Sequence, residues 1–167
     1  MDFKYQSPFI GRTEKPVIIS HEHREIGQIK RYFKNTSSTT RYDVNMTIEE
    51  FQTGDIYRID QTGFKLTRGA EWQVFKNDQP IGHIKTPEGI FKTDQIDISI
   101  EGQPEITFKA KLFGSVKIIG NQQTDIGFTK SPAGLKRVYE GQIDEAYLNI
   151  PLILFYSLVH TFWCAFD

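Results

Sequence analysis

Apolar and polar positions alternate in short runs along residues 16–143, with turn residues between the runs. The clearest run is 106–112, in which Thr107, Lys109 and Lys111 share one face and the apolar residues between them share the other. A strand with one dry face and one wet face favours antiparallel pairing. The pattern therefore predicts an antiparallel sheet rather than a parallel sheet covered by helices.

Runs of this kind, rich in β-branched and aromatic residues, predict about twelve strands. The expected strands cover 17–20, 24–34, 41–48, 55–59, 63–68, 71–76, 80–85, 89–92, 95–101, 105–113, 115–119, 124–130 and 134–142.

An internal repeat links two distant hairpins of this sheet. Residues 81–92 align with 126–137, and a weaker third copy begins at Ile26-Gly27. In the two stronger copies a strand leads into Thr/Ser-Pro-x-Gly, which is typical of a tight turn. The glycine after each isoleucine predicts a bulge or a close approach by another backbone. The repeat favours hairpins recurring around one closed sheet, and the alternative is a chance recurrence of a common hairpin motif.

The segment 150–166 is apolar on every side, since thirteen of its seventeen residues are aliphatic, aromatic, cysteine or alanine. As a helix it would be roughly 25 Å long, shorter than the bilayer core of about 30 Å. Acidic residues flank it at Asp144, Glu145 and Asp167, and no lysine or arginine borders it. These features favour a helix buried in the protein over a tail anchor or an oligomer interface.

Only a closed sheet covers such a helix on all sides. Burying its large apolar side chains is worth about 15–30 kcal/mol before entropy is counted. We therefore expect a mainly β protein, a closed antiparallel barrel of about twelve strands around a buried C-terminal helix at 150–166. The 167 residues predict a single domain, with 1–15 as a loosely ordered N-terminal arm.

Composition narrows the function by exclusion. The formal net charge of −1 gives no overall attraction to nucleic acid or anionic membranes, although a local patch is compatible with it. Cys164 is the sole cysteine, so no intrachain disulfide forms, which suits a reducing compartment. The first sixteen residues lack the pattern of a signal peptide. We expect a cytoplasmic protein, peripheral to the membrane if it contacts one.

A resemblance to a known group rests on the chain's last residues and on one strand stretch. The apolar run from Pro151 to Phe155, the terminal Cys164-Ala165-Phe166-Asp167, and the hairpin 72–82 resemble the tubby-like group. This group includes tubby C-terminal domains, LURP-one-related proteins and phospholipid scramblases. The resemblance implies a twelve-stranded antiparallel barrel around a hydrophobic helix. It also implies a binding or scaffold protein, with phosphoinositide recognition as in tubby domains.

Candidate catalytic and metal-binding residues are few. His21 and His23 would lie on one side of a strand, but two ligands are too few for a metal site. His160 is interpreted as a neutral core histidine bonded to a backbone carbonyl or to Ser157. Cys164 is expected to be buried rather than nucleophilic. Without a nucleotide-binding or hydrolase motif, we expect no catalysis, no cofactor and no metal.

Lysines on the wet faces of two strands carry the one binding hypothesis. Lys109 and Lys111 share a face, and Lys117 follows beyond Gly114. Tubby domains hold a phosphorylated headgroup with lysine and arginine on barrel strands, so the resemblance makes these three lysines candidates for binding a phosphoinositide or another anionic lipid headgroup. Glu105 and Asp125 would neutralise them locally, and the alternative is ordinary solubilising lysines.

Three rival functions remain open at this level. They are a barrel that binds a small molecule in its lumen, a tail-anchored membrane protein, and an enzyme without a recognisable motif. Nucleic-acid binding is disfavoured, because no cluster of basic and aromatic residues follows a strand.

Overall fold

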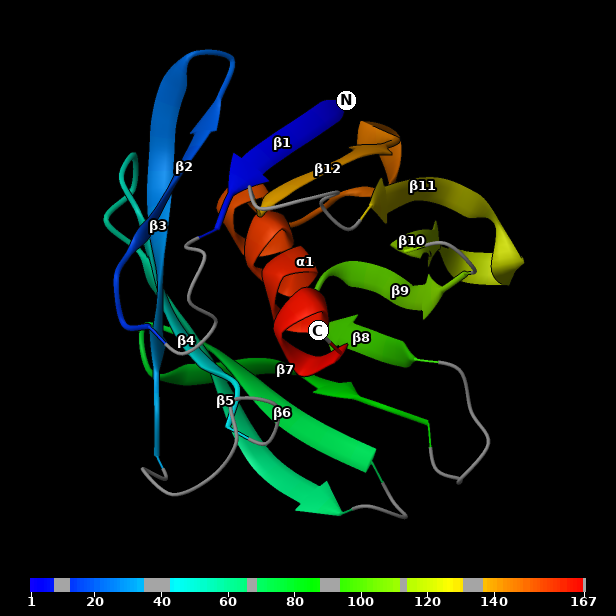
Figure 1. Ribbon diagram of the computed structural model, residues 1–167, viewed down its shortest axis with the longest axis horizontal. Coiled ribbons are helices and arrows are strands. Elements are labelled where there is room, and N and C mark those ends of the chain that lie inside the picture. The colour runs from blue at the N-terminus through cyan, green and yellow to red at the C-terminus, as the bar shows by residue number, and fades with distance from the viewer. Residues whose placement is uncertain are drawn as a thin grey trace.

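The computed structural model describes residues 1–7, 13–34, 43–65, 69–87, 94–111, 114–130 and 137–166. Within these ranges, one twelve-stranded antiparallel sheet curls around a single α-helix (Figure 1). The strands are β1 (Asp2–Gln6), β2 (Val17–His21), β3 (Arg24–Tyr32), β4 (Asn45–Glu50), β5 (Ile56–Lys65), β6 (Gly69–Lys76), β7 (Gln79–Lys85), β8 (Gln95–Ile100), β9 (Gln103–Ala110), β10 (Ser115–Ile119), β11 (Asp125–Lys130) and β12 (Val138–Ile143). Two 3₁₀ turns, η3 (Asn121–Gln123) and η4 (Glu145–Tyr147), precede the helix α1 (Leu152–Phe166).

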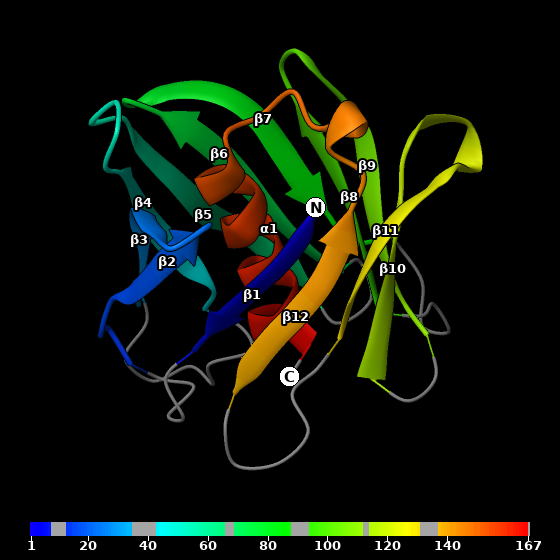
Figure 2. The same ribbon diagram turned by 90° about the horizontal axis from the view of Figure 1, so that it is seen from above.

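The sheet follows chain order from β2 to β12, and β1 then pairs with β12. Asp2 lies opposite Gln142 in this last pairing. Strands β1 and β2 are consecutive in sequence but stand at the two ends of the hydrogen-bonded order. The barrel is therefore nearly closed, with a seam between β1 and β2. Figure 2 shows β1 lying along β12, across α1 from the sheet formed by β5 and β6.

The N-terminal residues differ from expectation. We expected 1–15 to form a loosely ordered arm, whereas Asp2–Gln6 is strand β1. Phe3 and Tyr5 are only 3% and 4% exposed and belong to the core. The alternation of Phe3 and Tyr5 with polar residues is a strand pattern, but it is too short to stand out in the sequence.

Most expected strands are present, with ends shifted by a few residues. The two strands expected at 55–59 and 63–68 are one strand, β5, with a bulge between Gln61 and Gly63. A turn was expected between the two runs, and a β-bulge within one strand takes its place. The expected strand 89–92 lies outside the described residues, as do the outer parts of the strands expected at 41–48, 63–68, 105–113 and 134–142.

Helix α1 fills the interior of the barrel, as the apolar segment predicted. Twelve of its fifteen residues are buried. Aromatic rings from several strands pack edge-on against it: Phe3 lies 5.3 Å from Phe155, and Phe108 lies 6.2 Å from Phe162, measured between ring centroids. Among the described residues, no helix is both long and apolar enough to cross a bilayer. Because α1 occupies the centre, the rival hypothesis of a ligand in an open lumen finds no support in the fold (Figure 1).

The sequence repeat recurs in the structure at β3, β7 and β11, which lie four strands apart. Each is preceded by a turn in which two consecutive residues other than glycine have positive φ. The isoleucine of each repeat unit then accepts a backbone hydrogen bond from the residue directly after the next strand. The turn pairs are Glu22-His23, Asn77-Asp78 and Gln122-Gln123. The backbone hydrogen bonds run from Phe51 to Ile26 at 3.0 Å, from Glu101 to Ile81 at 2.8 Å, and from Asp144 to Ile126 at 2.8 Å.

The glycine of each repeat unit confirms the expected close approach of another backbone. A Cβ at Gly27, Gly82 or Gly127 would overlap a carbonyl oxygen of the following strand. In the preceding strand, a bulge begins directly after the residue that pairs with the glycine. We call the strand groups β2–β4, β6–β8 and β10–β12 the first, second and third repeat units. The glycines of the Thr/Ser-Pro-x-Gly turns lie outside the described residues.

Candidate functional site

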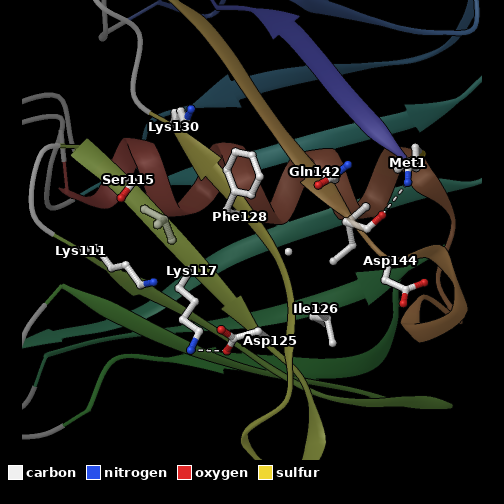
Figure 3. A pocket seen from close by; sticks show the side chains of 13 residues that line it. Met1, Lys111, Ser115, Lys117, Asp125, Ile126, Phe128, Lys130, Gln142 and Asp144 are labelled. Carbon is white, nitrogen blue, oxygen red and sulfur yellow. Dashed lines mark hydrogen bonds and ion pairs between the residues drawn. The ribbon is translucent and has the colours of Figure 1, made fainter.

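A groove of about 720 Å³ lies on the outer face of the third repeat unit (Figure 3). We call it the β10–β12 groove. Two of the three predicted lysines, Lys111 and Lys117, line it. Its other polar and aromatic lining residues include Ser115, Asp125, Phe128, Lys130, Gln142 and Asp144.

Sheet register explains how these side chains meet. Lys117 pairs with Lys109 on one side and with Phe128 on the other, and Phe128 pairs with Gln142. Residues directly opposite one another in antiparallel strands point to the same face. These side chains therefore form one row across β9–β12. Lys109, the third predicted lysine, is exposed in this row but does not line the groove.

The lysines of the groove differ in their partners. Lys117 forms an ion pair with Asp125, the carboxylate expected to neutralise it. The ammonium of Lys130 lies 5.3 Å from the centroid of the Phe128 ring, within reach of a cation–π interaction. Lys111 and Lys130 form no salt bridge within the described ranges. Among the lysines that line the groove, only Lys117 forms an ion pair with a carboxylate of the described residues.

The opposite wall of the groove carries a carboxylate. Asp144 follows β12 directly, and its Oδ1 accepts a hydrogen bond of 3.1 Å from the N–H of Ala146 at the start of η4. The beginning of this turn fixes the position of the carboxylate, which stays exposed to solvent. Figure 3 places Lys111 and Lys117 on one side of Phe128, and Gln142 and Asp144 on the other.

A smaller depression of about 360 Å³ continues from the groove across β12 and β1. It shares Phe128 and Lys130 with the groove and adds Lys4 and Glu140. Lys130 lies opposite Glu140, and Glu140 lies opposite Lys4, so charges of both signs alternate across this surface. Phe128, which is 38% exposed, stands where the two depressions meet.

The repeat units provide an internal comparison of this surface. The positions compared are the residue after the repeat glycine and its pairing partners in the two neighbouring strands. In the third unit these are Phe128, with Lys117 and Gln142 as partners. The corresponding residues are Gln28, with Ile18 and Glu49, in the first unit, and His83, with Gln73 and Ser99, in the second. Lys130 is matched by Lys30 and Lys85. The same backbone therefore forms with very different outer side chains. Lys117 and Phe128 are particular to the third unit, whereas Lys130 is common to all three.

His160 lies in the core, with its ring nitrogens facing two side chains. Nδ1 is 3.3 Å from the Tyr5 hydroxyl, and Nε2 is 3.6 Å from the sulfur of Cys164. The expected partner was a backbone carbonyl or Ser157, which instead donates to the carbonyl of Ile153. That interpretation of the partner is wrong because the Ser157 hydroxyl bonds back to its own helix, one turn earlier.

The Cys164–His160 pair does not favour nucleophilic catalysis. Burial, followed by the positive charges of Arg31 and Arg137, lowers the pKa of His160 to about 3. An imidazole that resists protonation stabilises an adjacent thiolate poorly. Cys164 is half-buried at the end of α1, less enclosed than expected.

The two histidines considered for a metal site do not share a strand face. His21 ends β2, and His23 lies in the following turn with a φ of 65°. Within the described ranges, no group of three metal-binding side chains comes together.

Phe128, Lys130, Gln142 and Asp144 escaped the sequence reasoning, because their proximity depends on strand register. A signal was nevertheless present. In the alignment of the repeat, Phe128 falls at the position of His83 and Gln28, so an exposed aromatic residue replaces a polar one.

Comparisons with protein-family models, with curated proteins and with solved structures found no match.

Proposed function

We propose that this chain is a non-enzymatic binding protein that recognises anionic lipid headgroups at a membrane surface through the β10–β12 groove. One observation carries the proposal. Lys111 and Lys117 line the same outer groove as Lys130, beside the exposed ring of Phe128. Lysine ammonium groups bind phosphate as point charges. An exposed aromatic ring beside them suits the boundary between headgroups and acyl chains.

The internal comparison supports a functional reading of these side chains. The first and second repeat units form the same hairpins with Ile18 and Gln73 in place of Lys117. The fold therefore does not require a lysine at this position. The fold does not require a phenylalanine at position 128 either, because this partly exposed side chain adds little apolar burial to the core.

The proposal includes membership of the tubby-like group. A twelve-stranded antiparallel sheet wrapped around a hydrophobic helix at the chain's end is the arrangement that the resemblance implies. With a net charge of −1, binding would depend on this local surface rather than on the whole molecule. We further propose a cytoplasmic protein whose contact with the membrane is peripheral and reversible.

Co-sedimentation of the full chain with vesicles tests the proposal. Vesicles that contain phosphoinositide or another anionic lipid should bind it at low salt, and neutral phosphatidylcholine vesicles should not. The double substitution Lys111→Gln and Lys117→Gln should weaken binding by about fivefold or more per lysine, since each juxtamembrane lysine is worth about 1 kcal/mol.

Lys30→Gln with Lys85→Gln is the matched control, because it removes the same charge from exposed strand positions outside the groove. This control should bind like the unchanged protein. Absence of binding above the neutral vesicles would refute the proposal. Equal losses in the two double variants would show that net charge acts and the groove does not.

A further inference from the structure

We propose that Lys111, Ser115 and Lys130 together hold one phosphomonoester, so that the β10–β12 groove selects lipids with a terminal phosphate, such as phosphatidic acid. The inference rests on the proposed function and names the headgroup class of the same site. It follows from the strand register, which sets a short hydroxyl side chain between two lysines that form no ion pair with a described carboxylate.

The three side chains lie in one row across β9–β11. The N–H of Lys111 donates to the carbonyl of Ser115 at 2.7 Å, which continues the register of the β9–β10 hairpin by one pair beyond Ala110 and Val116. Ser115 in turn pairs with Lys130. Residues directly opposite one another in antiparallel strands share a face, and all three residues line the groove. Figure 3 shows Ser115 between Lys111 and Lys130.

The spacing of this row suits one phosphate. Lys111 and Lys130 stand two strands apart, which puts about 10 Å between their backbones at the usual strand separation. Two hydrogen bonds of about 2.8 Å with the anion between them span most of this distance. Because the side chain of Ser115 is short, it leaves room for an anion above it, and a serine hydroxyl is itself a donor. One phosphate therefore reaches both lysines.

Charge and donor number favour a monoester over a diester. A phosphomonoester carries about 1.5–2 negative charges near pH 7 and three terminal oxygens. Two ammonium groups and a hydroxyl match both numbers. A phosphodiester has a single negative charge and one terminal oxygen fewer, so it would leave one lysine of the row without a partner. Lys117, which is paired with Asp125, adds only a general attraction to anionic surfaces.

The same row can be followed in the second repeat unit, across β5–β8. It reads Gly63, Glu71, Lys85 and Asp97 there, against Lys111, Ser115, Lys130 and Glu140 in the third unit. The lysine at the third place is common to both units. Its neighbour at the second place is a carboxylate in the second unit and a hydroxyl in the third, and a further lysine then replaces a glycine. The fold therefore forms without the pair of lysines that flanks Ser115.

Vesicle binding at matched surface charge tests the inference. Phosphatidic acid carries a phosphomonoester, whereas phosphatidylglycerol and the phosphatidylcholine background carry diesters. Phosphatidylglycerol at twice the mole fraction of phosphatidic acid supplies at least as much charge. At equal ionic strength the full chain should bind the phosphatidic acid vesicles about fivefold more tightly, the effect of one further hydrogen bond at an exposed site.

Ser115→Ala removes the hydroxyl from the row without changing its charge. This variant should bind phosphatidic acid vesicles about threefold more weakly and phosphatidylglycerol vesicles as before. Ser99→Ala is the matched control, since Ser99 is a half-buried serine of β8 that does not line the groove. The control should bind both kinds of vesicle like the unchanged protein, and circular dichroism should show the same fold for both variants.

Lys130→Gln tests the cation at the place common to the repeat units. It should remove the preference for phosphatidic acid, because a single lysine then faces the phosphate. Lys85→Gln removes the same charge from the equivalent place in the second unit, where Glu71 and Asp97 lie on either side. This control should keep the preference.

Soluble compounds identify the group that is recognised. Glycerol 3-phosphate, a monoester, should compete with the phosphatidic acid vesicles more strongly than dimethyl phosphate, a diester, at equal ionic strength. Equal binding to the charge-matched vesicles, or an undiminished preference in Ser115→Ala and Lys130→Gln, would overturn the inference and leave the proposed function standing. Failure to bind any anionic vesicle would refute the proposed function itself.

Discussion

His160 is a buried base held neutral by its surroundings. Tyr5 and Cys164 face its two ring nitrogens, Tyr139 packs edge-on against the ring, and Arg31 and Arg137 add positive charge nearby. In the neutral ring one nitrogen donates and the other accepts, so both contacts can be satisfied at once. Protonation would place a third positive charge in the same region of the core.

Acid should therefore destabilise the protein through His160. Its pKa is about 3 in the folded state and near 6.5 in an unfolded chain. Between these values the unfolded state binds more protons, so the free energy of unfolding falls as the pH drops below 6.5, by roughly 1 kcal/mol per pH unit. Urea unfolding at pH 7 and pH 4.5 measures this loss.

In His160→Asn the amide can still face Tyr5, and the loss between pH 7 and pH 4.5 should be much smaller. His23→Asn, at an exposed turn, should leave the pH dependence unchanged. Parallel pH profiles for the unchanged protein and His160→Asn would contradict this account.

At the scale of residues, sequence could nominate single lysines but not their neighbours. Lys111 and Lys117 were predicted because alternation alone tells which face of a strand is wet. Phe128 and Asp144 were not, because their place beside the lysines depends on the register of β11 and β12. A register is fixed by turns and bulges whose effects accumulate over many residues.

At the scale of elements, the glycines of the repeat allow neighbouring strands to approach closely. At Gly82, a Cβ would overlap the carbonyl oxygen of Ser99 and lie 2.8 Å from Cα of Ile100. Both are backbone atoms, which cannot move aside as a flexible side chain can. The glycine and the bulge in the preceding strand therefore occur together in each repeat unit.

Gly82→Ala should lower the free energy of unfolding by about 1–3 kcal/mol, the usual loss when an extra carbon is forced into a packed site. Gly63→Ala is the matched control, since the nearest heavy atom to its added Cβ would be 4.0 Å away. Its stability should stay within about 0.5 kcal/mol of the parent. Denaturant unfolding of both variants checks the prediction, and equal losses would contradict it.

The elements themselves were largely predictable. Long alternating runs such as β9, and the wholly apolar α1, were found because burial on one face or on all faces leaves a clear periodicity. Strand β1 was missed because only Phe3 and Tyr5 mark its inner face. Strand β5 was expected as two strands, because the bulge between Gln61 and Gly63 uses the same residue types as a turn.

At the scale of the whole molecule, barrel and helix depend on each other. The inner faces of the strands and the buried surface of α1 form one continuous core. Deleting residues 150–167 should leave this inner surface without a partner, and we expect an aggregated, unfolded product. Circular dichroism and gel filtration measure the outcome. A monomeric truncation with the full strand signal would show that α1 is dispensable for folding.

The pairing of β1 with β12 has a consequence for synthesis on the ribosome. Asp2 and Gln142 must meet across almost the whole chain, and α1 emerges after every strand that surrounds it. At about 5–20 residues per second, the apolar inner faces of the strands wait several seconds for the helix that covers them. Contacts of such long range also slow folding itself. A nascent chain of this protein should therefore need chaperone protection until helix α1 has emerged and packed against the strands.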